Sequence, residues 1–268
     1  MLLKDLVTVG ENAKYLPRVL SSSQCTDSKH RVLFSESEYV TKSAVTFARL
    51  IKEAIIGQGI GFGQPAHLFT FGSGGRTDER WLFVNGIATD RDIAILNARC
   101  LNAVFKQSID VVYNPTYGVI ADLVECAFER TLNRTCLASI RLTTEVLTSL
   151  RAGLKVKVIA HSQGGIIASR MLEQIKNTKD IPKDKLEVYT FASGADEDVP
   201  VPCVFQEHFL NDEDFVSRIG LMSVKTSGSK YVRKGVGHLL NRDYLEHFAG
   251  GLMCNKSSHL YRLMSRNL

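Results

Sequence analysis

The chain has 268 residues, 44% hydrophobic and 23% charged, which is the balance of a soluble globular protein long enough for one well-buried domain. Its 33 Lys and Arg against 28 Asp and Glu give a net charge of +5, but the basic residues are scattered rather than gathered in a block. We therefore expect no nucleic-acid partner, while a peripheral contact with an anionic membrane surface stays open.

The first residues, MLLKDLVTVGENAKYL, carry charges within the first five positions and lack the apolar core of a signal peptide. No segment reaches the roughly 18 apolar residues that a membrane span needs. The six cysteines form no C-x-x-C pair and no metal-like cluster with histidine, so most are expected to be buried thiols in a reducing compartment. These patterns predict a cytoplasmic protein, which could also lie at the periphery of a membrane. They predict no oligomeric state.

Residues 1–75 differ in composition from the rest and are predicted to form an N-terminal extension that could act as a cap or lid. Residues 41–56 have apolar positions at helical spacing, typical of a helix that packs on the core or serves as a lid or membrane-surface element. The glycines of GQGIGFGQP follow no strand and open no helix, so a dinucleotide site is unsupported and a flexible connector is expected.

From Trp81 onward, strand patterns alternate with helical patterns. Such alternation predicts parallel pairing through crossovers, hence an α/β fold with a mostly parallel central sheet and helices on both faces, over residues 76–268. Functional sites in such sheets gather at the carboxyl ends of the strands. The strand patterns are at 81–85, 109–115, 155–160, 185–193 and 202–211, and the helical patterns at 89–105, 118–130, 136–153 and 164–176.

Ser162 lies at the junction of the strand KVKVIA and the helical stretch GGIIASRMLEQIK. So tight a turn strains the serine backbone and needs small residues two positions before and after it, here Ala160 and Gly164. The plainer alternative is a serine that caps the helix. His161, beside it, cannot readily swing back to act as the base of this serine, so a structural role is expected.

The string AHSQGG resembles the nucleophile elbow of the α/β-hydrolase superfamily, particularly its lipase-like and esterase members, in which G-H-S-x-G-G is frequent. Ala160 replaces the first glycine and is still small. The resemblance covers roughly residues 81–248 and implies an α/β-hydrolase fold, a nucleophilic Ser162, and an acid and a histidine downstream in that order. It implies no metal and no organic cofactor.

His238 is the expected base, because it lies on a Gly-flanked loop before a helical pattern, where the superfamily places its histidine. His247, on that helix, is the fallback. His208, in a strand pattern, is expected to be buried or at a sheet edge, and His259 lies in a polar tail.

For the acid, NDEDFV follows the penultimate strand and is similar to the N-x-x-D-x-V pattern of lipase-like members, which selects Asp214, with Asp212 next and Glu213 also competing. Asp196 and Asp198, after the preceding strand, are expected to be solvated.

The oxyanion hole needs two backbone N–H groups near the developing negative charge. One is expected from Gln163, at a helix N-terminus. The resemblance of NGIATD to the His-Gly loop of lipases implies that the other comes from Gly86 or Ile87, with Asn85 in the place of the histidine and in contact with substrate. Tyr117, in NPTYG, either lines the substrate pocket or belongs to a plain turn.

The resemblance thus implies a serine hydrolase with a Ser162, His238 and Asp214 triad that cleaves carboxylic esters, including lipid or other acyl esters, through an acyl-enzyme. Two alternatives remain at this level. One is a thioesterase or acyltransferase with the same triad, because a triad does not encode the leaving group. The other is a hydrolase-like scaffold that has lost catalysis and serves binding.

Overall fold

The computed structural model describes residues 67–86, 89, 91–114, 137–253 and 257–265 of the chain. Within them, one sheet of seven strands has the order β1-β3-β2-β4-β5-β6-β7, and all neighbouring pairs are parallel except β1 with β3. The strands are β1 (His67–Phe71), β2 (Glu79–Val84), β3 (Ile109–Tyr113), β4 (Lys155–His161), β5 (Leu186–Phe191), β6 (Phe205–Asn211) and β7 (Ser229–Arg233).

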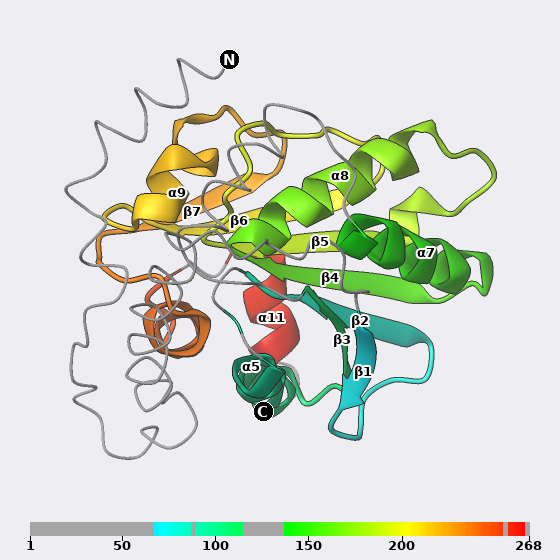
Figure 1. Ribbon diagram of the computed structural model, residues 1–268, viewed down its shortest axis with the longest axis horizontal. Helices are drawn as coiled ribbons and strands as arrows, with labels where there is room; N and C mark the ends of the chain where they lie inside the picture. The colour runs from blue at the N-terminus through cyan, green and yellow to red at the C-terminus, as the bar shows by residue number, and fades with distance from the viewer. Residues whose placement is uncertain (1–66, 87–88, 90, 115–136, 254–256, 266–268) are drawn as a thin grey trace, which may run out of the picture.

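Helices cover both faces of this sheet (Figure 1), which confirms the predicted mostly parallel α/β fold. The longer helices follow the strands as crossover connections, as right-handed parallel pairing requires. The helices are α5 (Arg91–Phe105), α7 (Leu137–Arg151), α8 (Gln163–Asn177), α9 (Phe215–Ile219), α10 (Glu246–Ala249) and α11 (His259–Ser265), with short turns η2 (Lys183–Lys185) and η3 (Leu221–Ser223) and a π-helical segment η4 (Leu240–Leu245).

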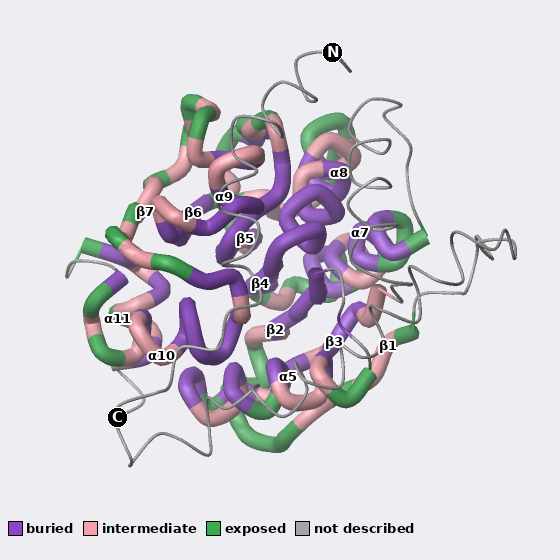
Figure 2. The backbone as a smooth tube through the Cα atoms, turned by 60° about the vertical axis from the view of Figure 1, so that its left-hand side comes forward, coloured by how far each residue is buried: buried purple, intermediate pink, exposed green. Residues whose placement is uncertain are grey.

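Two apolar layers follow from the alternation of side chains along each strand. On β2, Trp81 and Phe83 join the layer beneath α5, η4 and α10, whereas Leu82 and Val84 join the layer beneath α7 and α8. The strands at the centre of the sheet are accordingly buried along most of their length (Figure 2). Burial on both faces explains why these strands read as continuous apolar runs in the sequence.

The two outermost strands, β1 and β7, have no counterpart among the sequence predictions. Both are half-buried edge strands of five residues, HLFTF and SKYVR, without a run of buried apolar positions. Strand β1 belongs to the sheet although it lies within the span 1–75 that was predicted to be an extension. The predicted helix at 41–56, the Gly-rich segment before His67 and the predicted helix at 118–130 lie outside the described residues.

A helix also occupies part of the predicted polar tail. Glu207 on β6 is only 1% exposed, and its carboxylate accepts hydrogen bonds from Ser258 Oγ at 3.1 Å and from the backbone N–H groups of His259 and Leu260 at 2.7 and 3.1 Å. These are the unpaired donors of the first turn of α11, and a carboxylate there also suits the helix dipole. Glu207 thereby fastens α11 to the sheet.

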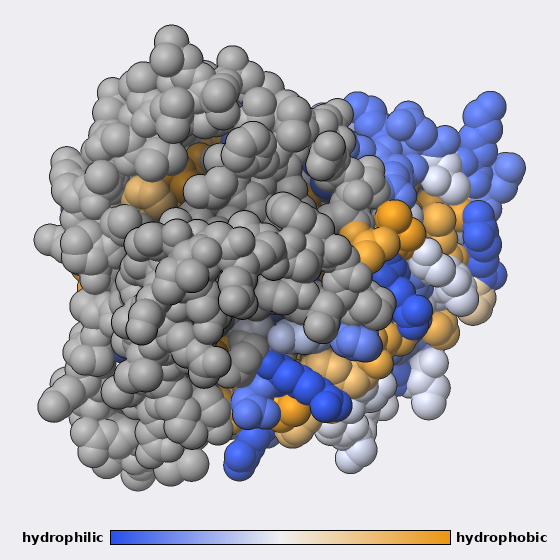
Figure 3. Space-filling view, viewed as in Figure 1, coloured by the Kyte–Doolittle hydropathy of each residue, from blue (hydrophilic) through white to orange (hydrophobic). Residues whose placement is uncertain are grey.

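The described surface carries charges of both signs. At the end of α8, on the right of Figures 1 and 3, the face is mostly hydrophilic, and Lys176, Lys179, Asp180 and Asp184 are exposed. Acidic and basic side chains are therefore mixed at this end. Among the described helices, none combines the length and apolarity that crossing a bilayer demands.

Candidate active site

Ser162 occupies the sharp turn between β4 and α8, in a backbone conformation that a non-glycine residue rarely adopts. Its φ is 59° and its ψ is −121°. Such a conformation costs on the order of 1–3 kcal/mol and persists only where the surroundings enforce it. Here Ser162 N–H donates to Phe191 O at 3.1 Å, and Ser162 O accepts from Gly165 and Gly194 N–H at 2.9 and 3.0 Å. The hydroxyl makes no capping bond to α8, so the helix-cap alternative is wrong.

The small residue two positions after the serine, Gly164, is required because the end of strand β2 lies against it. A Cβ on Gly164 would lie 2.4 Å from Val84 O, the backbone at the end of β2. A Cβ on Gly165 would lie 2.1 Å from Ser193 Oγ, on the loop after β5. The two glycines therefore let α8 begin directly against the end of β2 and the loop after β5.

His238 lies within hydrogen-bond reach of both Ser162 and Asp214. Its Nε2 is 2.8 Å from Ser162 Oγ, and its Nδ1 is 2.9 Å from Asp214 Oδ2 and 3.1 Å from Oδ1. The histidine is 7% exposed and stands on the loop between β7 and η4, after Gly237, whose φ is 95°. Three residues from separate loops thus form one chain of contacts, from the serine through the imidazole to the carboxylate. His247, the alternative candidate for the base, lies on α10.

Asp214 is buried, at 1% exposure, and heavily hydrogen-bonded. Besides His238, its carboxylate accepts from Val216 N at 2.9 Å, Ser217 Oγ at 3.1 Å and Tyr244 Oη at 2.6 Å. Burial by itself would raise the pKa of Asp214, but the charge of His238 and the hydrogen bonds from His238, Tyr244 and the Val216 N–H hold it below its ordinary value. The carboxylate is therefore ionised where it meets the imidazole.

Asp212 has a different task. Its Oδ1 accepts from Gly235 N–H at 2.9 Å, and its own N–H donates to Arg233 O at 3.0 Å. These bonds hold the loop after β6 against the loop after β7. The structure therefore brings Asp214, and not Asp212, to the imidazole of His238.

The backbone of Gly86 packs directly on the serine. A Cβ at Gly86 would lie 2.4 Å from Ser162 Cβ and 3.0 Å from its Oγ. Gln163, the other predicted oxyanion donor within the described residues, is the first residue of α8, where backbone N–H groups have no partner within the helix. Gly86 thus lies beside the hydroxyl and Gln163 follows Ser162 directly in the chain, whereas Ile87 and Tyr117 lie outside the described residues.

The side chain of Asn85, for which a contact with substrate was predicted, is fully buried in a network of amides. Its Oδ1 accepts from Asn114 N–H at 2.8 Å, and its Nδ2 donates to Asn114 O at 2.9 Å and to Gly86 O at 3.0 Å. The Asn114 side chain in turn donates to Gln163 Oε1 at 2.9 Å. These amides brace the ends of β2 and β3 against the start of α8.

His161 contacts His238 through its ring and through a hydrogen bond to the backbone. The two rings lie 4.9 Å apart, centroid to centroid, and His161 Nε2 donates to the backbone carbonyl of His238 at 2.8 Å. Burial, and next the charge of His238, lower the pKa of His161 to about 3, so this ring is neutral near pH 7. The prediction of a structural rather than a basic role for His161 agrees with this contact.

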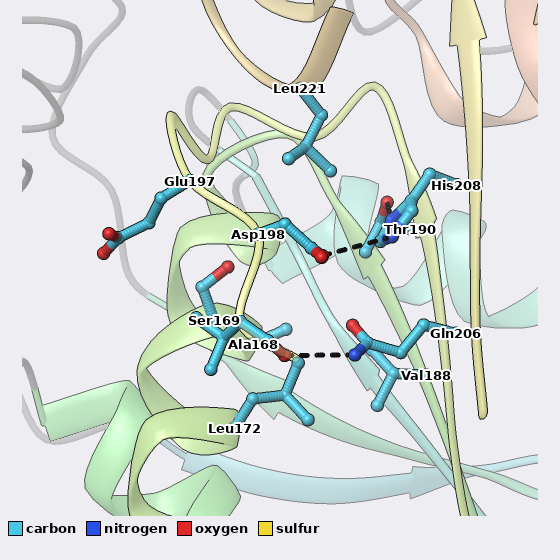
Figure 4. Close-up of a pocket in the computed structure, with 12 residues that line it drawn as sticks. Ala168, Ser169, Leu172, Val188, Thr190, Glu197, Asp198, Gln206, His208 and Leu221 are labelled. Carbon is cyan, nitrogen blue, oxygen red and sulfur yellow. Dashed lines mark hydrogen bonds and ion pairs between the residues drawn. The ribbon is translucent and has the colours of Figure 1, made fainter. Parts of the chain in front are cut away.

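A small pocket with polar and apolar lining residues lies between helix α8 and strands β5 and β6 (Figure 4). In it, His208 and Asp198 point toward one another, with Nε2 and Oδ1 3.8 Å apart, and His208 Nδ1 lies 2.9 Å from Thr190 Oγ1. The Asp198 side chain is only 7% exposed, so the expectation of a solvated charge is wrong for this residue. Burial lowers the pKa of His208 to about 4. Among the residues that the structure describes, no cluster of three His, Cys, Asp or Glu could hold a metal ion.

Searches of family models and of curated proteins found no match to this chain. Among solved structures, an esterase of the archaeon Pyrobaculum calidifontis aligns at 10% identity and a TM-score of 0.43, over 85% of this chain and 92% of its own. Esterase PE8 aligns at 13% identity and 0.40, over 70% and 97%, and the esterase domain of a Rhodothermus marinus protein at 12% and 0.37, over 69% and 95%.

The assignment of the fold rests on this chain itself. The sheet is parallel apart from β1, and the serine stands on a strained turn after the central strand β4. A histidine from the loop after β7 contacts that serine, and a carboxylate from the loop after β6 contacts the histidine. This chain has the α/β-hydrolase fold that its elbow sequence predicted.

Proposed function

We propose that this protein is a serine hydrolase of carboxylic esters, including lipid or other acyl esters. The single observation that supports the proposal most is the chain of contacts from Ser162 Oγ through His238 to Asp214, at 2.8 and 2.9 Å, on a strained turn. A serine hydroxyl is a weak nucleophile near pH 7 unless an oriented base takes its proton.

In the proposed mechanism, Ser162 Oγ attacks the carbonyl carbon as its proton passes to His238 Nε2. Asp214, which accepts from Nδ1, keeps the imidazole oriented and stabilises its positive charge. The carbonyl oxygen becomes an oxyanion beside the backbone N–H groups of Gln163 and the Gly86 loop. The C–O bond of the ester breaks, and the alcohol leaves with the proton from His238. A water molecule, deprotonated by His238, then cleaves the acyl-serine and restores the hydroxyl.

A neutral His161 suits this mechanism. When His238 takes up the proton, a second cation at a ring distance of 4.9 Å would oppose it. With the pKa of His161 lowered to about 3, no such repulsion arises across the neutral pH range. The buried Asp214 carboxylate is then the charge in direct contact with the imidazolium.

The test is labelling by a fluorophosphonate probe together with turnover of p-nitrophenyl acyl esters. The wild-type chain is expected to be labelled and active, and Ser162→Ala to lose labelling and at least about 10⁴-fold in kcat/KM without unfolding. Ser223→Ala, at an exposed serine of η3, is the control and should behave as the wild type. A folded wild-type chain that resists the probe and turns over no ester would overturn the proposal.

The substrate class needs a second experiment. Esters of increasing acyl length, assayed with and without anionic vesicles, distinguish a small-ester esterase from a lipid hydrolase. Acyl thioesters and added alcohols as acyl acceptors test the thioesterase and acyltransferase alternatives in the same assay. A higher kcat/KM on a thioester than on the matched oxygen ester would move the assignment to that class.

A further inference from the structure

Tyr244 is a fully buried residue of η4 whose phenol reaches the candidate acid. Its Oη lies 2.6 Å from Asp214 Oδ2, and it accepts a hydrogen bond from Asn211 N–H at 3.1 Å. The hydroxyl also lies 2.9 Å from Ser217 Oγ, which itself donates to Asp214 Oδ2. A backbone N–H can only donate, so the phenol proton points at the carboxylate, the nearer of its two possible acceptors. The bond is short, as hydrogen bonds to a charged acceptor are.

We propose that Tyr244 is a positioning residue of this site, and that its hydrogen bond fixes the orientation and the proton-attracting strength of Asp214 and, through Asp214, of His238. The proposal rests on the proposed function, because the role of Asp214 there is to orient His238. Tyr244 itself lies behind the carboxylate and acts only through it.

The carboxylate oxygen that Tyr244 contacts is the one nearest the imidazole. Asp214 Oδ2 accepts from His238 Nδ1 at 2.9 Å, from Tyr244 Oη at 2.6 Å and from Ser217 Oγ at 3.1 Å. Each donor spreads part of the negative charge of that oxygen. Without the phenol, Oδ2 would attract the imidazole proton more strongly, and the carboxylate would have one fewer bond to hold its plane.

The phenol is a donor at every pH at which the protein is expected to work. Burial, and then the nearby charge of Asp214, raise the pKa of Tyr244 well above its ordinary value. The other charged groups around this network are His161 beneath His238, and Arg233, Arg242 and Asp243 beside η4. All of them are retained in a Tyr244→Phe variant, so a change in titration is attributable to the lost hydroxyl.

Packing can be separated from hydrogen bonding. The Tyr244 ring meets Phe191 and His161 edge-on, at centroid distances of 6.2 and 6.3 Å, contacts that phenylalanine would keep. A matched control exists elsewhere in the chain. Tyr189 is equally buried, and its hydroxyl donates to Glu187 Oε2 at the same 2.6 Å, in a network with Lys157 that does not include the triad.

The experiment is a pH titration of the His238 imidazole by NMR, with ¹⁵N-histidine label, on wild type, Tyr244→Phe and Tyr189→Phe, alongside the pH profile of kcat/KM. In Tyr244→Phe, we expect the imidazole midpoint and the acid limb of the profile to move to higher pH by about half a unit to one unit. We expect kcat to fall about tenfold and KM to change little, because Tyr244 does not touch substrate. Tyr189→Phe should match the wild type in all of these.

Unchanged imidazole titration in a folded Tyr244→Phe variant would overturn the proposal. So would a loss of activity without a shift of the acid limb, or equal effects of the two tyrosine variants, since either result means a structural role only. If Tyr244→Phe fails to fold, Ser217→Ala, which removes a donor to the same oxygen, must move the midpoint in the same direction. The NMR titration needs no turnover, so an inactive wild type would sink the proposed function while the shift still decides the role of Tyr244.

Discussion

His161 and His238 lie one above the other and are joined by a hydrogen bond from the ring of the first to the backbone carbonyl of the second, at 2.8 Å. The residue that precedes the elbow serine therefore anchors the loop that carries the candidate base. Two positions 77 apart in the sequence are thereby held in one small unit.

Replacing His161 by phenylalanine tests this anchor. The variant keeps an aromatic ring under His238 but loses the donor, which leaves a buried carbonyl unpaired at a cost of about 1–3 kcal/mol. We expect kcat for ester hydrolysis to fall about tenfold with little change in KM. His259→Phe, at a half-exposed histidine that also contacts an aromatic ring, is the control. Equal activity of the two variants would contradict an anchoring role.

The roles of Asp214 and Asp212 can be separated by matched substitutions. Asp214→Asn removes the charge that faces His238 Nδ1, and kcat should fall by about 10³-fold or more. Asp212→Asn keeps an acceptor for the Gly235 N–H and should stay within a few-fold of wild type. Steady-state kinetics on one p-nitrophenyl ester decides between them, and the reverse order of effects would transfer the acid role to Asp212.

Gly86→Ala should impair the site. The added Cβ would lie 2.4 Å from Ser162 Cβ, so either the serine or the loop that follows β2 must shift. Displacement of an oxyanion donor costs about 10²–10³ in kcat. Gly250→Ala, with a nearest contact of 3.4 Å at the end of α10, should leave kcat unchanged. Full activity of Gly86→Ala, with circular dichroism and thermal unfolding unchanged, would show that the contact is not needed.

Because His208 is buried, we expect the folded protein to lose stability in acid. Burial lowers the pKa of His208 from 6.5 to about 4. The charge of Asp198 opposes this by raising the pKa, and the smaller effect of Lys230 lowers it further. The unfolded chain therefore binds this proton more readily, so the stabilisation present above pH 6.5 is lost as the pH falls toward 4.

The measurement is urea unfolding at pH 7 and pH 5 of wild type and His208→Gln. Between these pH values, the wild type should lose about 2 kcal/mol more of its free energy of unfolding than the variant. His161, whose pKa is lowered in the same direction, is present in both chains and cancels in the comparison. Equal losses in the two chains would mean that His208 does not contribute to the acid sensitivity.

The features that the sequence predicted well are those that short, contiguous patterns of residues encode. Strand β4, the turn at Ser162 and helix α8 are contiguous, and continuous apolar runs mark strands buried on both faces. Asp214 and His238 were selected by likeness to a family pattern, and the structure brings both to Ser162. The edge strands β1 and β7 were missed because half-exposed strands of five residues carry little apolar signal.

What the sequence could not predict depends on partners from distant strands. The amide of Asn85 pairs with the backbone of Asn114 at the end of β3, which no local spacing reveals. Likewise, nothing near Tyr244 in the sequence indicates that its hydroxyl meets Asp214. Buried polar pairs of this kind become visible only when the sheet order is known.

The hydrogen bonds that the Glu207 carboxylate accepts from the start of α11 limit how far the chain can be shortened from its C-terminal side. Removing the residues from Ser258 onward would take three hydrogen-bond donors away from this carboxylate, a loss on the order of 3 kcal/mol. That is a sizeable part of the roughly 5–15 kcal/mol by which a domain is stable. A purification tag is therefore safer after this helix than in its place, and a protease cut before residue 258 would loosen β6, the strand that leads to Asp214.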